Sequence, residues 1–138
     1  MSDLTLVTGA TGMVGSALVR SLVADDERVR ILIRPTSQLD LLGGASLYVD
    51  RAMGDITDPE SLALAMEGVT RVYHCAALVD DGRDVSAMHR VNVEGTRHVC
   101  DAALHAGVRK LVHVSSIAAL GRTATGGTID ESQEWTPS

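Results

Sequence analysis

The chain has 138 residues, and its 12 Lys and Arg against 18 Asp and Glu give a formal net charge of −6. This length suits a single domain over residues 1–138 with an aliphatic core, because Phe, Trp and Tyr make up only 2 % of the residues. So few aromatic rings exclude stacking platforms for single-stranded nucleic acid, and the acidic balance argues against broad contact with a phosphate backbone.

Short runs of Val, Leu and Ile alternate with longer stretches of helical period, which is typical of a parallel sheet covered by helices. One helix opens at Asp58-Pro59-Glu60, with Asp as N-cap and Pro at the first helical position, and closes at Gly68. In chain order we expect a strand at 4–7, a helix at 13–24, strands at 28–33 and 46–53, the helix after Asp58, a strand at 69–75, a helix at 84–106 ending before Gly107, and a strand at 110–115.

Five strands joined in βαβ order predict an α/β fold. Because such crossovers are right-handed, we expect a doubly wound parallel sheet of the Rossmann type with strand order 3-2-1-4-5. The ligand crevice of such a sheet lies outside the carboxyl ends of its strands. Candidate site residues are therefore those that directly follow a strand.

A glycine-rich turn, Thr8-Gly9-Ala10-Thr11-Gly12-Met13-Val14-Gly15, joins the first strand to the first helix. Gly9 permits a tight turn, Gly12 lets the backbone approach a pyrophosphate, and Gly15 lets the helix pack on the strand. No Gly-Lys-Ser or Gly-Lys-Thr follows, which excludes a P-loop hydrolase. An ordinary glycine turn is the alternative, but the flanking strand and helix favour a dinucleotide site. The residues assigned to it here are Gly9, Thr11, Gly12, Met13, Val14 and Gly15.

This turn resembles the fingerprint of the extended short-chain dehydrogenase/reductase superfamily, and four further stretches match the superfamily in order. They are Gly54-Asp55-Ile56-Thr57-Asp58, His74-Cys75-Ala76-Ala77, Val91-Asn92-Val93-Glu94-Gly95-Thr96 and Val114-Ser115-Ser116-Ile117-Ala118. Within the superfamily the sequence is most similar to the dihydroflavonol-reductase-like and sugar-epimerase-like branch. The resemblance implies the cofactor-binding part of an NAD(P)-dependent enzyme that reduces a carbonyl, or oxidises an alcohol, by hydride transfer. A nucleotide-sugar epimerase or dehydratase and a non-catalytic NADP-binding module are the alternatives.

Arg34 stands at the end of the second strand, where NAD-selective members carry an acidic residue for the ribose 2′-OH. An Arg there can pair with a 2′-phosphate, and Thr36 and Ser37 could add hydroxyl donors. We therefore expect NADP to be preferred over NAD, with an exposed strand-end Arg as the alternative.

The resemblance also assigns the residues after the third and fourth strands to the cofactor. Asp55, with the Ile56 backbone beside it, matches the adenine-contacting position, although an Asp can simply begin a turn. Ala76 and Ala77 match positions where small side chains let the cofactor lie against the backbone. His74 and Cys75, just before them, are expected to be core or supporting residues.

Asn92 matches a family Asn that supports the site through hydrogen bonds, and a solvent-facing Asn is the alternative. In the family, dimers form through the helix that corresponds to 84–106 and through a second helix. A homodimer through 84–106 is therefore a possible assembly. Gly95 is a weak point for helix propensity in this helix, and the alternative interpretation is a close approach of two backbones.

Ser115 and Ser116 end the fifth strand, next to where a nicotinamide would lie. Ser116 matches the catalytic position that polarises a substrate carbonyl or hydroxyl, and Ser115 matches the neighbour packed near the cofactor. Serines that only cap a turn are the alternative.

The family's proton-transferring Tyr-x-x-x-Lys pair is absent from the 138 residues, because Ala52 and Ala77 stand four positions after Tyr48 and Tyr73. It is expected beyond 130–137, a stretch that resembles the family's run-up to it. The substrate is expected to be a small molecule, and no nucleic-acid or membrane partner is expected.

Only two cysteines, with no metal-ligand spacing, favour a reducing compartment and no metal site. No apolar run approaches the roughly 20 residues of a membrane-spanning helix, and the N-terminus lacks the positive charge of a signal region. We therefore expect a cytoplasmic protein.

Overall fold

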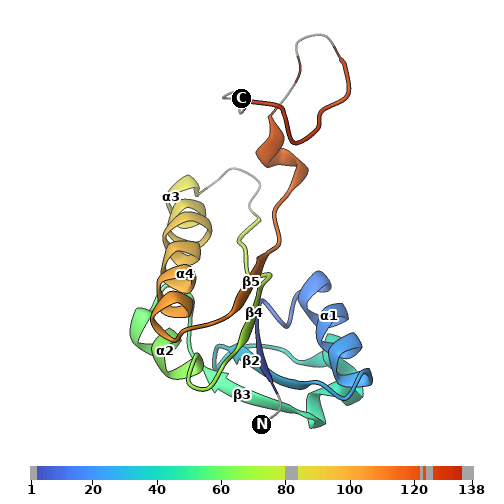
Figure 1. Cartoon of the computed structure of the whole chain (residues 1–138), viewed down its shortest axis with the longest axis vertical. Coiled ribbons are helices and arrows are strands. Elements are labelled where there is room, and N and C mark those ends of the chain that lie inside the picture. The colour runs from blue at the N-terminus through green and yellow to red at the C-terminus, as the bar shows by residue number, and fades with distance from the viewer. Residues whose placement is uncertain (1–2, 80–83, 122, 124–125, 135–138) are drawn as a thin grey trace.

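The computed structural model describes residues 3–79, 84–121, 123 and 126–134. Five parallel strands form one sheet in the order β3-β2-β1-β4-β5, which confirms the predicted topology. Helix α1 covers one face of the sheet, and α2 and α4 cover the other (Figure 1). The strands are β1 (Leu4–Thr8), β2 (Arg28–Ile33), β3 (Val49–Met53), β4 (Arg71–His74) and β5 (Lys110–His113), and these helices are α1 (Met13–Ala24), α2 (Pro59–Ala65) and α4 (Thr96–His105).

β1 lies at the centre of the sheet, where Leu6 is in register with Arg30 of β2 and with Val72 of β4. All five residues of β1 are buried, because helices cover both of its faces. One apolar cluster, which includes Leu62 and Val99, fills the space under α2 and α4, and a second fills the space under α1.

The predicted boundaries of α1 and β2 hold, and α2 begins where predicted but ends at Ala65, before a turn that reaches Gly68. The Asp58 carboxylate accepts a hydrogen bond from the Glu60 amide at 3.1 Å and so caps α2. Gly68 and Gly107 follow α2 and α4 with φ of +72° and +70°, as expected for residues that end helices.

The third strand is shorter than predicted, because residues 46–48 do not pair with β2. Residues Asp40–Leu47 instead form a 3₁₀ segment, η1, whose Leu42 is wholly buried in the cluster under α1. The Arg20 side chain of α1 donates a hydrogen bond to the Leu41 carbonyl. Packing against α1 therefore holds this segment away from the sheet until Val49.

β4 and β5 are also shorter than predicted, since β4 covers Arg71–His74 and β5 ends at His113. A 3₁₀ turn, η3 (Ile117–Leu120), follows β5. Ser115 therefore lies beyond the paired strand. Trp135-Thr136-Pro137, part of the expected approach to Tyr-x-x-x-Lys, lies outside the described residues.

The predicted helix 84–106 is helical throughout but not of one type. It runs as α3 (Val85–Met88), a π-helical stretch η2 (His89–Gly95) and α4. A Cβ added to Gly95 would lie 2.8 Å from Ile56 Cδ1. A close approach at Gly95 is therefore present, but it is to the Ile56 side chain and not to another backbone as expected. None of the helices in the described ranges is both long and apolar enough to span a membrane.

Candidate functional site

The glycine turn is held in its shape by contacts that only glycine permits. Gly9 has φ +68°, and a Cβ added there would lie 2.5 Å from the Ala76 amide nitrogen. A Cβ on Gly15 would lie 2.1 Å from the Gly9 carbonyl oxygen, so α1 packs directly against the turn. The Gly12 amide donates to the same Gly9 carbonyl at 3.1 Å. Gly9 and Gly15 thus take the structural roles expected of them.

The start of α1 is open to an anion. Gly12 is its N-cap, with no capping side chain and no acidic residue in the first turn. The partial positive charge of the helix start is therefore not offset by a side chain of this turn. Met13 and Val14, the next two residues, are exposed.

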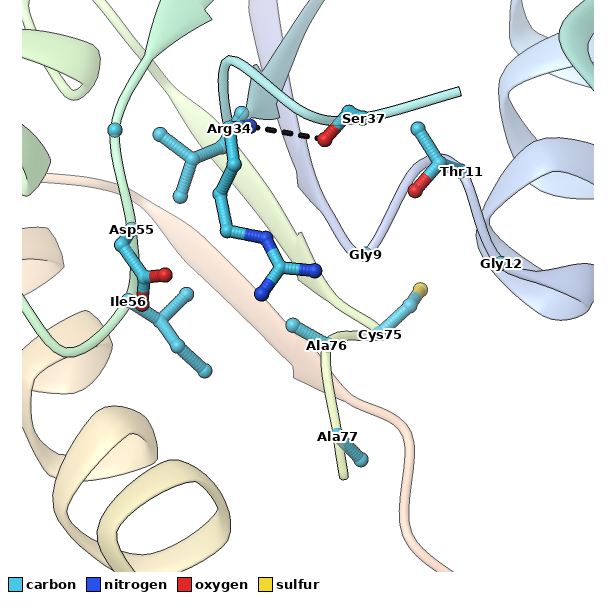
Figure 2. A pocket seen from close by; sticks show the side chains of 12 residues that line it. Gly9, Thr11, Gly12, Arg34, Ser37, Asp55, Ile56, Cys75, Ala76 and Ala77 are labelled. Atoms are coloured by element: carbon cyan, nitrogen blue, oxygen red, sulfur yellow. Dashed lines mark hydrogen bonds between the residues drawn. The ribbon is translucent and has the colours of Figure 1, made fainter. Parts of the chain in front are cut away.

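A cavity of about 240 Å³ lies beside this turn, at the carboxyl ends of the central strands. Figure 2 shows the glycine turn on one side of it and Arg34, Asp55 and Ile56 on the other. Eight of the residues predicted to bind the cofactor line it: Gly9, Thr11, Gly12, Arg34, Asp55, Ile56, Ala76 and Ala77. The predicted residues that do not line it are Met13, Val14, Gly15, Asn92, Ser115 and Ser116.

Ser37, named above as a possible hydroxyl donor to a 2′-phosphate, also lines the cavity. Three lining residues were not assigned to the cofactor from sequence: Leu32, Gly54 and Cys75. Cys75 was expected only to support the site, yet strand alternation could have found it. Residues next to each other near a strand end face opposite sides, so Cys75 faces the cavity where His74 faces α4. Burial raises the pKa of the Cys75 thiol.

Arg34 directly follows β2, and its guanidinium extends into the cavity (Figure 2). Its amide donates to Ser37 Oγ at 3.0 Å, and the Ser37 amide donates to the Arg34 carbonyl at 3.0 Å. No carboxylate of the described residues forms a salt bridge with Arg34. The guanidinium thus adds an unpaired positive charge to the cavity.

Asp55 both forms a turn and lines the cavity. Its Oδ1 accepts hydrogen bonds from the Thr57 amide at 2.9 Å and from the Thr57 hydroxyl at 2.8 Å. Its backbone is held by Ser61, whose hydroxyl accepts from the Asp55 amide at 3.1 Å. The turn alternative is therefore correct, and it leaves Asp55 at the cavity wall.

Asn92 lies in the π-helical stretch and faces the chain that follows β4. Its Oδ1 accepts from the Leu78 amide at 2.8 Å, and its Nδ2 donates to the Leu78 carbonyl at 2.9 Å. The solvent-facing alternative is therefore wrong. Asn92 fixes the backbone just after Ala76 and Ala77.

His74 is wholly buried, as its predicted core position requires. Its Nδ1 lies 2.6 Å from the Thr8 hydroxyl, and its Nε2 lies 2.9 Å from the Thr96 hydroxyl. Burial, and to a smaller extent the nearby His113, lowers the pKa of His74 to about 4. The imidazole is therefore neutral at pH 7.

Ser115 and Ser116 are both exposed beyond β5. The Ser116 hydroxyl accepts a hydrogen bond from the Ala118 amide at 3.2 Å and caps η3. A hydroxyl that accepts this bond still has its own proton to donate. The cap alternative is thus present, and catalysis by Ser116 stays a prediction.

A model of the NAD dependent epimerase/dehydratase family matches residues 5–138. The chain belongs to this family. The extended short-chain dehydrogenase/reductase resemblance is thereby confirmed.

Two relatives and one solved structure show how much of such a protein the chain represents. It is 47 % identical to sterol demethylase protein B of Methylococcus capsulatus, over 97 % of this chain and 40 % of that protein. It is 38 % identical to a Synechocystis protein named after dihydroflavonol 4-reductase, over 97 % of this chain and 38 % of that one. A short-chain dehydrogenase/reductase superfamily protein from Agrobacterium tumefaciens, solved with bound NAD, superposes with a TM-score of 0.82 at 32 % identity, over 99 % of this chain and 40 % of that one. The chain thus spans about two fifths of the length of these proteins.

Proposed function

We propose that this chain is the dinucleotide-binding part of an NAD(P)-dependent oxidoreductase of the extended short-chain dehydrogenase/reductase type. The observation that carries the proposal is the cavity, which has the start of α1 on one side and Arg34 with Asp55 on the other. The open helix start suits a pyrophosphate, and the backbone amides of Met13 and Val14, two exposed residues, belong to its first turn. Asp55 and Ile56 would then contact the adenosine.

When bound, the cofactor would exchange a hydride with a substrate carbonyl or alcohol carbon. Ala76, Ala77 and Ser115 would border its nicotinamide end, and Asn92 would keep that border in place through Leu78. Ser116 would donate its hydroxyl proton in a hydrogen bond to the substrate oxygen and stabilise the charge that develops there.

The cofactor that we propose is NADP rather than NAD. The unpaired Arg34 guanidinium in the cavity supports this choice, because it can form a charge-assisted bond with a 2′-phosphate. NAD binding by the Agrobacterium relative leaves NAD as the alternative.

The family also includes epimerases and dehydratases by its description, so conversion of a nucleotide sugar through the same hydride chemistry is the second candidate. A Tyr-x-x-x-Lys pair further along a longer reading frame would favour either enzyme over a module that only binds NADP. The proposed partner is a small-molecule substrate, with a homodimer through residues 84–106. The two free cysteines, Cys75 and Cys100, support a cytoplasmic location.

Cofactor binding can be tested by titrating the chain with NADPH and NADH and following fluorescence. The informative variant is Gly12→Asp, because a Cβ on Gly12 meets only the Gly9 carbonyl at 3.4 Å and Asp is a favourable N-cap. We expect unchanged or raised stability and at least tenfold weaker binding, since the carboxylate would occupy and repel the pyrophosphate position.

Gly44→Asp is the matched control, because it adds the same charge where a Cβ meets nothing within 4 Å and outside the cavity lining. This variant should bind like the unsubstituted chain. No binding of either dinucleotide by the unsubstituted chain, or equal binding by the two variants, would overturn the proposal.

A further inference from the structure

We propose that His74 is a positioning residue of the dinucleotide site: it fixes the Thr8 hydroxyl, and through it the close contact between Gly9 and Ala76, which both line the cavity. This inference rests on the proposed cofactor-binding function. His74 itself does not line the cavity, so its effect must pass through other residues.

The Thr8 hydroxyl links β1 to His74 and Ala76 through hydrogen bonds. It lies 2.6 Å from His74 Nδ1, and it accepts a hydrogen bond from the Ala76 amide at 3.3 Å. Thr8 directly precedes Gly9, and Gly9 and Ala76 both line the cavity. The Thr8 hydroxyl thus links the end of β1 to His74 at the end of β4 and to Ala76 just after it.

The backbones at Gly9 and at Cys75-Ala76 pack directly against each other. A Cβ on Gly9 would lie 2.5 Å from the Ala76 nitrogen and 2.6 Å from the Cys75 carbonyl carbon. A shift of Thr8 by a few tenths of an ångström would therefore change how Gly9 lies against Ala76. Protein interiors this closely packed transmit such displacements.

The other side of the ring is anchored to the neighbouring helix. His74 Nε2 lies 2.9 Å from the hydroxyl of Thr96, the first residue of α4. His113 stacks on the ring at a centroid distance of 5.2 Å. The imidazole thus has both nitrogens occupied and one face covered, which leaves it a single orientation toward Thr8.

The proton arrangement agrees with a neutral ring. The Thr8 hydroxyl, already an acceptor for Ala76, can donate its proton to Nδ1, and Nε2–H can then donate to Thr96. The opposite tautomer, with Nδ1–H donating to Thr8 and the Thr96 hydroxyl donating to Nε2, also satisfies every group. In either arrangement both ring nitrogens are hydrogen-bonded, and a buried ring nitrogen without a partner would destabilise the fold.

Two amide substitutions separate the link to Thr8 from the anchor on α4. An Asn side chain places a polar atom near the position of Nδ1, and a Gln side chain places one near Nε2. His74→Asn therefore keeps the bond to Thr8, and His74→Gln keeps the bond to Thr96. Both remove one buried bond, so a purely structural role would lower stability and NADPH affinity alike in the two variants.

The experiment measures the NADPH dissociation constant and the thermal midpoint of both variants of the 138-residue chain. We expect similar losses of thermal midpoint, with NADPH affinity within about threefold of the unsubstituted chain for His74→Asn and about tenfold weaker for His74→Gln. Equal affinities for the two variants, or weaker binding by His74→Asn, would overturn the role of the Thr8 link.

If neither His74 variant folds, the pair Thr8→Val and Thr96→Val decides, because each exchanges one hydroxyl for a methyl group at either end of the ring. Weaker NADPH binding confined to Thr8→Val supports the proposal, and equal affinities or a loss confined to Thr96→Val overturns it. An unsubstituted chain that binds no dinucleotide overturns the proposed function itself. Binding that is intact and equally strong in all variants overturns only the positioning role.

Discussion

β1 and β5 are both strands of one sheet, but they end in different surroundings. Every residue of β1 is buried, whereas no residue of β5 is. The glycine turn after β1 is fixed by contacts with Ala76 and α1, whereas Ser115 and Ser116 after β5 are exposed. The residues that we propose bind the cofactor are thus closely packed, whereas Ser115 and Ser116, which we propose lie near the substrate, are exposed to water.

The largest effect expected from this difference is that the chain binds NADPH but does not turn over substrate. Hydride transfer to a carbonyl leaves an alkoxide that must receive a proton, and a positioned acid contributes about 10²–10⁴-fold to rate. Tyr48 is exposed and Tyr73 lies half-buried in β4, and neither has a Lys four residues later. Absorbance at the NADPH band should stay constant with ketones, aldehydes and nucleotide sugars.

The control for this prediction is Ser116→Ala, which should leave NADPH affinity unchanged because Ser116 does not line the cavity. Sustained turnover by the unsubstituted chain that Ser116→Ala abolishes would show that the proton comes from a group within these 138 residues.

The next largest effect concerns the close packing around Gly9. Gly9 and Gly68 have nearly equal φ, +68° and +72°, but a Cβ on Gly68 meets nothing within 4 Å. Gly68→Ala should cost only the left-handed backbone penalty of about 1–2 kcal/mol. Gly9→Ala adds an overlap with the Ala76 backbone, so we expect a loss of roughly 3 kcal/mol or more and no NADPH binding. Urea denaturation of both variants measures the difference, and equal losses would contradict it.

The region around the glycine turn is also the part of the molecule that the sequence predicts best. The strand order follows from the apolar runs, and the end of each run places residues such as Gly9 and Arg34 at one edge of the sheet. The assignment of Asp55 and Ala76 to the cofactor came from the family resemblance. The strand order depends on the local apolar pattern, which can be identified in the sequence, and on the right-handedness of crossovers, which is general for parallel sheets.

The features that were not predicted depend on contacts between distant segments. The third strand begins late because Leu42 is buried against α1, which no local pattern in residues 40–48 reveals. The π-helical stretch brings Asn92 to Leu78 and Gly95 to Ile56, and a regular helical period cannot indicate it. The bond between Thr8 and His74 likewise joins residues 66 positions apart.

A third prediction concerns acid stability and His74. Because burial lowers its folded-state pKa from 6.5 to about 4, the unfolded chain binds the proton more readily between these values. The stabilising effect of the neutral ring is full above about pH 6.5 and is lost as the pH falls toward 4, by up to about 3 kcal/mol. Urea denaturation at several pH values should show this slope. His105→Gln, at an exposed site, should keep the slope, and His74→Gln should reduce it.

A smaller effect is expected for cofactor choice. Arg34→Asp replaces the cation in the cavity by a carboxylate, which repels a 2′-phosphate and can accept a hydrogen bond from a ribose 2′-OH. We expect NADPH binding to weaken by about tenfold or more, or roughly 1–2 kcal/mol, while NADH binding changes little. Calorimetric titration measures both. Arg97→Asp, which makes the same charge change on an exposed residue of α4, should leave the preference intact. Equal NADPH and NADH affinities in the unsubstituted chain would contradict the assignment of Arg34.

The smallest expected effect is self-association through residues 84–106, whose α4 part lies on the same face of the sheet as α2 (Figure 1). Val85, Val93 and Leu104 of this helical run are 71 %, 45 % and 79 % exposed, so it presents apolar surface to a partner. The family resemblance implies a dimer interface made of this helix and a second helix, and the described residues contain only the first of the two. Half of such an interface should associate weakly, because small interfaces seldom offset the entropy lost on association.

Sedimentation velocity should show a mainly monomeric chain with a concentration-dependent dimer, and Leu104→Glu should shift it further to monomer. A tight dimer that Leu104→Glu leaves unchanged would contradict assembly through residues 84–106.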